Sequence, residues 1–447
     1  MKKTLVSLVL GLAVSSGALA DDLATIYELA QANDPIINRA KAQKDAAYAG
    51  IAVSRANLLP QISGTLAYSD STRETLFGPS VVDIDSSTLS ADITLSMSLY
   101  DHANWLGLDR AELVAQQSDA SLGANMQSLM LRTTNAYLAV LREQDSVEFV
   151  KAELRAIERQ LEQTKQRFNV GLTAITDVHE AQANFDNTVA RQIRAENLLE
   201  LRLEELREIT GKYHSRISIL DTERFDAAPP TPATADAWME IAEESNLDLL
   251  AQRFARDIAK QDVDITRSGH YPTLGLRLNY GTSDNEQTFN GEKSSPPRLD
   301  DSSIGLTLSV PIYQGGSVSA NTDRNRANYV VAAENLELTY RQTVRSVRSS
   351  FNDVKAAIST IRALQQSVIS AESALTATEA GFDVGTRTIV DVLNSTRNVF
   401  DARRNLADAR YNFITAIVSL KQAAGTLKES DLLDINKVLM PAPVPAS

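Results

Sequence analysis

Apolar residues recur with heptad spacing in two separate segments of the chain. Intervals of three and four residues alternate from Val147 to Phe168, and the segment from Ile361 to Phe382 repeats the series in phase, 214 residues later. The first series is Val147, Val150, Leu154, Ile157, Leu161, Thr164 and Phe168, and the second is Ile361, Leu364, Val368, Ala371, Leu375, Thr378 and Phe382. Heptads kept in register across two copies predict long helices that supercoil against partners.

The residues that follow each heptad series repeat as well. The stretch from Arg167 to Val178 recurs from Gly381 to Val392 at the same offset. Self-similarity over such a distance indicates duplicated architecture, so we predict two structural halves, each with a helical hairpin whose tip lies near residue 171 or residue 385. The predicted segments are a first half at 21–212, a linker at 213–234, a second half at 235–427 and a loose C-terminal tail at 428–447.

The lengths of the predicted helices follow from the spacing of proline and glycine. No proline occurs from Asp101 to Val170, so a helix of about 70 residues would be ~100 Å long. After a turn at Gly171 the chain returns in a second helix to about Gly211. The second half repeats this pair over Gly316–Val384 and Thr388–Thr426. Each half also has one shorter predicted helical segment, at Leu23–Leu58 in the first half and Asp236–Arg267 in the second.

Four other segments alternate apolar and polar residues with a period of two, which predicts strands. They lie at about 61–70, 88–100, 273–282 and 303–313. The polar stretches of roughly 17 to 21 residues between the two members of each pair are predicted to be long loops. Alternation alone would also suit a β-sandwich with one face in water.

The first twenty residues predict export from the cytoplasm. Lys2 and Lys3 precede an apolar run, Leu5 to Val14, and the small-residue site Ala18-Leu19-Ala20 follows it. This is the layout of a secretory signal over 1–20 with cleavage before Asp21. The apolar run is too short for a transmembrane helix, which needs about 20 residues.

Any membrane span must then be built from the predicted strands, because no later segment is long and apolar enough to cross as a helix. Export, long loops, and Tyr100 and Tyr313 at strand ends, where an aromatic girdle would lie, favour membrane strands over a sandwich. Four strands cannot close a barrel, so strands from other copies of the chain must complete it.

Composition excludes several classes of function. The chain has 44 basic and 57 acidic side chains, a net charge of −13, which argues against nucleic-acid binding. It has no cysteine, and its four histidines, His102, His179, His214 and His270, lack metal-binding spacing. We find no nucleotide-binding glycine loop and no nucleophile elbow, so we predict no catalytic residue, no metal and no cofactor.

Three longer motifs resemble those of the TolC family of trimeric outer-membrane efflux and secretion channels. They are QRFNVGL at 166–172, SVPIYQGG at 309–316 and VGTRTIVDVL at 384–393. The resemblance implies an α+β homotrimer whose twelve strands form one β-barrel in outer-membrane lipid, continued by a periplasmic barrel of coiled-coil helical hairpins. It also implies an exit duct for drug efflux or type I protein secretion, opened at its periplasmic tip by an adaptor protein and an inner-membrane pump of the RND or ABC type.

The resemblance assigns a gate to the hairpin tips. In the family, an arginine and a tyrosine on one hairpin contact a threonine and an aspartate on the other, and the matching positions are Arg387, Phe382, Thr176 and Asp177. Phenylalanine lacks the hydroxyl, so the gate is expected to depend more on Arg387, whose planar fork can bind Asp177 bidentately.

The resemblance also places two acidic rings at the pore entrance, at Asp391 and at position 394. This chain has Asn394, so the second ring would be neutral. The tip residues would form small exposed grooves for adaptor hairpins: Val170, Gly171, Leu172, Val384, Gly385 and Thr386.

Two alternatives to this interpretation remain open on the residues alone. Asp177 and Asp391 fall in first helical turns, where carboxylates complement the helix dipole, and Thr388 with Asp391 has capping-box spacing. The chain as a whole could also be a periplasmic adaptor or a structural coiled-coil protein without a pore.

Overall fold

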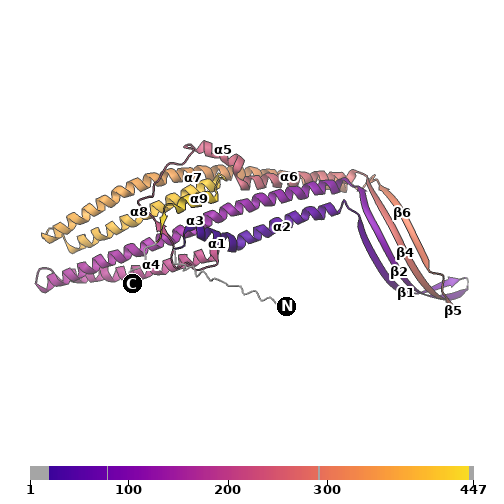
Figure 1. Ribbon diagram of the computed structural model, residues 1–447, viewed down its shortest axis with the longest axis horizontal. Coiled ribbons are helices and arrows are strands. Elements are labelled where there is room, and N and C mark those ends of the chain that lie inside the picture. The colour runs from indigo at the N-terminus through magenta and orange to yellow at the C-terminus, as the bar shows by residue number, and fades with distance from the viewer. Residues whose placement is uncertain (1–19, 78, 290–291, 442–447) are drawn as a thin grey trace, which may run out of the picture. The chain divides into compact units, whose positions relative to one another are not determined.

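The computed structural model describes residues 20–77, 79–289 and 292–441, which form two compact units (Figure 1). Unit 1 gathers the segments up to Asn38, from Ala124 to Asn246 and from Thr343 onward, and unit 2 consists of Arg39–Gly123 and Leu247–Gln342. Each unit draws on both halves of the sequence, so the repeats are not themselves the compact units. The predicted secretory signal lies outside the described residues, apart from Ala20.

The same order of elements occurs twice along the chain, which confirms the predicted α+β fold with two repeated halves. The first half contains α1 (Leu23–Asn33), α2 (Pro35–Ala56), β1 (Gln61–Phe77), β2 (Ser80–Tyr100), α3 (His102–Asn169) and α4 (Ile175–Thr210). The second half contains α5 (Ala235–Ser245), α6 (Leu247–Arg267), β4 (Thr273–Phe289), β6 (Leu299–Ser309), α7 (Ser317–Asp383) and α8 (Ile389–Ala423). The short elements are β3 (Ile219–Leu220), η1 (Ser268–His270), β5 (Glu292–Ser294), α9 (Glu429–Asn436) and β7 (Leu439–Met440).

The shorter helical segment of each half is broken into two helices, where the sequence predicted one. Pro35 begins α2 and cannot donate a backbone hydrogen bond to α1. The Asp34 side chain, 2% exposed, accepts from the Ile37 N–H at 2.9 Å and from Arg132 at 3.1 Å. In the second half, Asn246 ends α5, and its amide donates to the Ala423 carbonyl at 2.9 Å.

Unit 2 contains an antiparallel sheet in the order β1-β2-β4-β6, with β5 beside the far end of β4 (Figure 1). The register aligns the alternating positions of all four strands. One row across the sheet is Ile62, Leu95, Leu278 and Ile304, and the neighbouring row is Ser63, Thr94, Asn279 and Ser303. Since successive side chains point to opposite faces, one face of the sheet is apolar and the other is polar.

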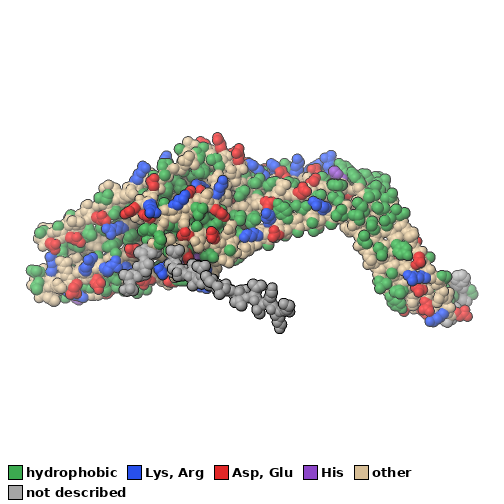
Figure 2. Space-filling view, in the orientation of Figure 1, with side chains coloured by type: hydrophobic (Ala, Val, Ile, Leu, Met, Phe, Trp, Pro, Cys, Tyr) green, Lys and Arg blue, Asp and Glu red, His purple; other side chains and the backbone are tan. Residues whose placement is uncertain are grey.

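The apolar face of this sheet is exposed within the chain. Ile62, Leu66, Ile304 and Leu306 are 66 to 76% exposed. Figure 2 shows hydrophobic side chains gathered over the strands near their helical ends, with charged side chains at the far ends. Contiguous exposed apolar surface of this kind marks contact with lipid or with another protein.

Two predicted features of the strands are wrong. The predicted loops within both strand pairs are mostly strand: β1 continues to Phe77 and β2 begins at Ser80, while β4 continues to Phe289 and β6 begins at Leu299. In this part of β1 and β2, polar side chains on both faces remove the alternation that predicts a strand. One cross-strand pair here is Thr72, whose hydroxyl donates to Asp85 at 2.7 Å. The fourth strand ends at Ser309 rather than near residue 313, and Pro311, which has no N–H for a ladder, follows at once.

Unit 1 is built on the two helical hairpins, α3 with α4 and α7 with α8. In α3, the heptad residues Val147, Val150, Ile157 and Leu161 are at most 8% exposed. Of the equivalent seven positions in α7, all of which the structure describes, Ile361 is buried and the other six are partly exposed. The heptad positions are therefore more fully buried in α3 than in α7.

The described part of the C-terminal tail is ordered, contrary to the prediction that it is loose. Leu427 and Leu432 are 2% and 1% exposed in the core of unit 1. Lys421 binds Asp431 at 2.6 Å, and β7 pairs with β3 in the linker between the halves. Pro443 and Pro445, which suggested looseness, lie outside the described residues.

None of the helices in the described part of the chain has both the length and the apolarity needed to cross a membrane.

A carboxyl group that forms no ion pair with any described residue lies in the interior of unit 1. The Tyr411 hydroxyl, on α8, donates to Asp145, on α3, at 2.6 Å. No ion pair joins Asp145 to a cation among the described residues, although Arg142 lies on α3 and Arg410 on α8. Glu148 and Asp408 add negative charge near the Asp145 carboxyl group. Burial is the main cause that raises the pKa of Asp145 to about 6.

This pKa predicts that stability depends on pH through Asp145. Because the folded pKa exceeds the unfolded one, the folded state holds the proton more tightly, and stability falls as pH rises from about 4 to 6. Asp145→Asn should therefore raise the free energy of unfolding by about 2 kcal/mol at pH 7.5 and change it little at pH 4. Unfolding of the detergent-solubilised protein at both pH values measures this effect.

Asp434→Asn is the matched control, because Asp434 is an exposed carboxyl group that Lys437 binds at 2.8 Å. An Asp145→Asn effect of equal size at pH 4 and pH 7.5 would contradict the assignment, since an effect of the ionised carboxylate must vanish once the group is protonated.

Candidate functional site

Each helical hairpin turns through a glycine with a positive φ angle. Gly171 has φ = 77° and Gly385 has φ = 80°, in the left-handed region that other residues rarely adopt. Leu172 N–H donates to the Arg167 carbonyl at 2.9 Å, and Thr386 N–H donates to the Gly381 carbonyl at 2.8 Å. These are the six-to-one bonds of the Schellman motif, which ends both α3 and α7 in the same way.

The tips expose apolar side chains to solvent. Val170, Leu172 and Val384 are 71%, 75% and 76% exposed. The other predicted tip residues, Gly171, Gly385 and Thr386, are also exposed. Each hairpin thus ends in exposed apolar side chains beside a glycine turn.

A small hydrophobic cluster joins the two hairpins just behind these tips. Its buried members come from α3, α4 and α8, and Phe382, near the end of α7, packs against them. The members are Ile157, Leu161, Ala181, Ile389 and Leu393, with Phe185 and Phe382 at the margin. Phe382, which the sequence assigned to the gate in place of a tyrosine, is thus part of the packing between hairpins.

Arg167 forms a contact between the two hairpins that the sequence did not predict. Its guanidinium, at the end of α3, binds the Asp383 carboxylate, at the end of α7, at 3.1 Å. The same group lies over the Phe382 ring, 4.5 Å from the centroid. The sequence contains one indication of this ion pair. At the repeat offset, Arg167 corresponds to Gly381 and Asp383 corresponds to Asn169, so the two halves differ at both positions of the pair.

Arg387 does not bind Asp177 within the chain. No ion pair or hydrogen bond joins these two side chains among the residues described here, and Arg387 is exposed. Arg387 instead folds back over α7, where a Cβ added to Gly381 would lie 2.8 Å from the Arg387 Cγ. Gly381 thus leaves the space that the Arg387 side chain occupies.

The remaining predicted gate and pore residues have local roles in the chain. Asp177 accepts a short hydrogen bond from the Thr173 hydroxyl, and Thr176 is exposed. Asp391 forms the expected capping box with Thr388: its carboxylate accepts from the Thr388 N–H at 2.9 Å. Hydrogen bonds from the Thr388 backbone and hydroxyl, with the charge of Arg387, lower the pKa of Asp391. Asn394 is exposed on the next turn.

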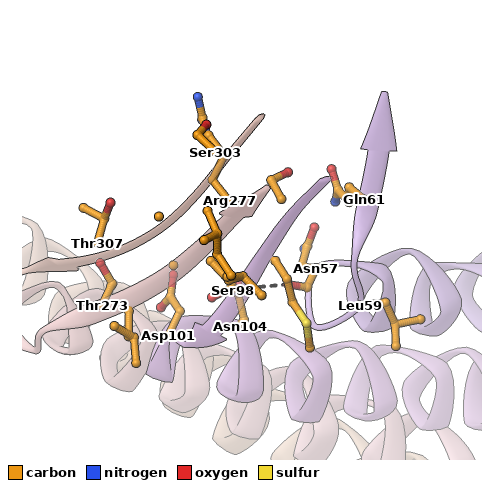
Figure 3. Close-up of a pocket in the computed structure, with 17 residues that line it drawn as sticks. Asn57, Leu59, Gln61, Ser98, Asp101, Asn104, Thr273, Arg277, Ser303 and Thr307 are labelled. Atoms are coloured by element: carbon orange, nitrogen blue, oxygen red, sulfur yellow. Dashed lines mark hydrogen bonds between the residues drawn. The ribbon is translucent and has the colours of Figure 1, made fainter. Parts of the chain in front are cut away.

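A wide, open hollow of about 730 Å³ lies in unit 2, where the sheet meets the ends of the helices (Figure 3). Most of its lining is polar and includes Arg277, which sits in the row of the sheet next to Ser96 and Gly305. Asn104 donates to the Asn57 carbonyl at 3.4 Å across its rim. The hollow is open and its lining is more polar than apolar, unlike the enclosed, mainly apolar lining typical of a tight small-molecule site.

In the described ranges, 20–77, 79–289 and 292–441, no group of three or more His, Asp or Glu side chains could hold a metal ion. His214 is buried between Asp21, at 2.7 Å, and the Thr210 hydroxyl, at 3.0 Å, and so packs the interior of unit 1.

Comparison with known proteins places this geometry in a family. The sequence model of the outer membrane efflux protein family matches the chain twice, over residues 26–212 and 238–426. The outer membrane protein TolC of Vibrio cholerae serotype O1 is 46% identical over 441 residues, 98% of each chain. The alkaline protease secretion protein AprF of Pseudomonas aeruginosa is 30% identical over 416 residues, 91% of this chain and 85% of AprF.

A solved structure has the same fold. The CmeC outer membrane channel of Campylobacter jejuni superposes with a TM-score of 0.77 at 16% identity, covering 94% of this chain and 90% of CmeC. The matched family and the relatives thus define a channel subunit of the outer membrane with a periplasmic extension, which serves as an exit duct and is not an enzyme. The chain belongs to the outer membrane efflux protein family.

Proposed function

We propose that three copies of this chain form one channel through the outer membrane, closed at the hairpin tips until partner proteins open it. The observation that carries the proposal is the sheet of unit 2, whose outer strands β1 and β6 each pair on one side alone among the described residues. Long unpaired edges are a template for strands of another chain. Three sheets joined edge to edge would give twelve strands and leave no edge exposed.

The two faces of the sheet support this arrangement. In such a ring, the apolar face with Ile62 and Ile304 would contact lipid, and the polar face with Ser63 and Ser303 would line the water-filled lumen. Arg277 would then project from the polar face into the channel beside the hollow of Figure 3.

The heptad seam of α7, where six of the seven positions are partly exposed, supports a contact between copies. Its partly exposed positions are those that pack a partner helix in a coiled coil. A neighbouring copy would cover these positions and continue the ring of strands as a ring of helices.

We assign the gate to the contact between Arg387 of one copy and Asp177 with Thr176 of the next. Arg387 is exposed and makes no ion pair among the described residues, so its guanidinium is free to bind a carboxylate across a chain boundary. Asp391 would form an anionic ring near this constriction, and Asn394 a neutral one.

Cargo and partners follow from the relatives. AprF is a secretion protein by name, and the family is one of efflux proteins, so the chain is assigned to export of small molecules and of proteins. The apolar tip residues Val170, Leu172 and Val384 are the docking sites for a periplasmic adaptor, which would link the channel to an inner-membrane pump.

Planar-bilayer recording of the purified protein tests the proposal. The protein should conduct with a low single-channel conductance, and Arg387→Ser should raise that conductance several-fold, because each of three copies loses a charge-assisted contact. Arg326→Ser is a matched control, since Arg326 pairs with Asp323 of its own helix, at 2.8 Å. A protein that does not conduct, as expected of an adaptor or a structural spacer, would refute the channel, and unchanged conductance in Arg387→Ser would remove the gate.

A further inference from the structure

We infer that Arg167 and Asp383 form a second latch, which ties the tips of the two hairpins of one chain together. The inference rests on the proposed function, because a latch matters only if the tips move. It assigns a gating role to two residues outside the contact between Arg387 and Asp177.

The first argument is the number of contacts that Arg167 makes. The guanidinium binds Asp383 at 3.1 Å and lies 4.5 Å from the Phe382 centroid, so one side chain holds two successive residues at the end of α7. An ion pair and a cation–π contact share the same group, and the Phe382 ring is fixed in turn by the hydrophobic cluster between the hairpins.

The second argument is which elements the pair joins. Most exposed ion pairs on α4, such as Arg202 with Glu205, lie within one helix and cannot resist a movement between hairpins. Arg167 and Asp383 are 216 positions apart and belong to different hairpins. Separating the tips of the two hairpins must break this pair and lift Arg167 from Phe382.

The third argument is the asymmetry of the repeats. The converse contact, from α7 to α3, would use Gly381 and Asn169, which carry no charge. The latch can therefore form only with its arginine at the end of α3 and its aspartate at the end of α7. Gly381 serves the other contact, since its missing Cβ leaves room for Arg387. The halves have thus diverged so that Arg167 holds the hairpins within a chain and Arg387 is left for a neighbour.

The magnitude of the effect follows from exposure. Arg167 is 27% exposed and Asp383 is 63% exposed, so the ion pair is partly screened by water. Together with the cation–π contact, its loss should raise the ratio of open to closed channels about three- to tenfold.

Single-channel recording of the whole protein tests the latch with a charge-reversal cycle. Arg167→Gln, which removes both contacts, should raise the ratio of open to closed channels by this factor, and Asp383→Asn should raise it less because Arg167 still lies over the Phe382 ring. The double variant should resemble Arg167→Gln, because no further contact is lost. Arg167→Asp combined with Asp383→Arg should return the open fraction toward the native value, a rescue that a packing defect would not give. Arg202→Gln, which breaks an ion pair inside α4, should leave gating unchanged.

Two outcomes would overturn the inference, and they differ in what they imply. If both single variants gate like the native protein while Arg387→Ser opens the channel, the latch is absent and the proposed gate stands. If Arg387→Ser is also without effect, the tips do not gate, and the latch fails together with the function on which it rests.

Discussion

Gly425→Ala should lower the free energy of unfolding by about 3 to 5 kcal/mol, the range of severe core defects. Gly425 follows α8 with φ = 73°, a conformation that disfavours any side chain. A Cβ at this position would lie 2.2 Å from the Ser245 carbonyl oxygen and 2.5 Å from the Ser245 carbonyl carbon. These are backbone atoms at the end of α5, so no side-chain rotation can relieve the overlap.

The clash would also disturb the hydrogen bonds that join α8 to its neighbours. Asn246 donates to the Ala423 carbonyl at 2.9 Å, and Gln127 donates to the Gly425 carbonyl at 2.8 Å. Moving α8 away from α5 would stretch the first bond and tilt the second, leaving buried polar groups poorly paired.

Gly211→Ala is a matched control provided by the repeat. Gly211 ends α4 with the same φ of 73°, but a Cβ there would meet Asn33 Cβ at 3.6 Å, an ordinary contact. It should cost about 1 kcal/mol, from the backbone conformation alone. Denaturant unfolding of both variants measures the difference, and equal losses would mean that α5 can move aside without cost.

Ile304→Lys should prevent stable insertion in the outer membrane. Ile304 is 76% exposed in the middle of β6, on the apolar face of the sheet. A lysine on the lipid face costs about 2 to 4 kcal/mol near the bilayer centre, and a homotrimer would carry that cost three times. The amount of protein recovered in the outer-membrane fraction should fall sharply.

Ser303→Lys is the control, because Ser303 is the preceding residue of β6 and lies on the polar face. It should be recovered in the outer membrane in native amounts. If both lysine variants insert equally well, the apolar face does not contact lipid, and the orientation of the sheet proposed here is reversed or wrong.

The sequence predicted those elements whose pattern is repeated over many residues. α3 runs from His102 to Asn169, within one residue at each end of the segment expected from proline and glycine spacing. Long helices and half-buried strands impose a period on the chain because one face must differ from the other. Where both faces of a strand carry polar side chains, as in the outer parts of β1 and β2, that signal is lost and the sequence predicts loops.

Contacts between distant residues were much harder to predict. The pair of Arg167 with Asp383 joins segments that no local pattern connects, and the divergence of the repeats at these positions acquires meaning only once the hairpins are seen side by side. The ordered tail was missed for another reason. The prolines near the end of the chain led to the prediction of a loose tail. The burial of Leu427, Leu432 and Leu439 instead fixes α9 and β7 in place.

The composition of unit 1 bears on how the chain is made. This unit needs the start of the chain, its middle and its last segment, through β7 beside β3. A polypeptide delivered from its N-terminus cannot finish that core until synthesis is nearly complete. The nascent chain thus lacks a complete unit 1 for most of its translation, a delay suited to an outer-membrane polypeptide that must be threaded unfolded through a translocation pore before it folds.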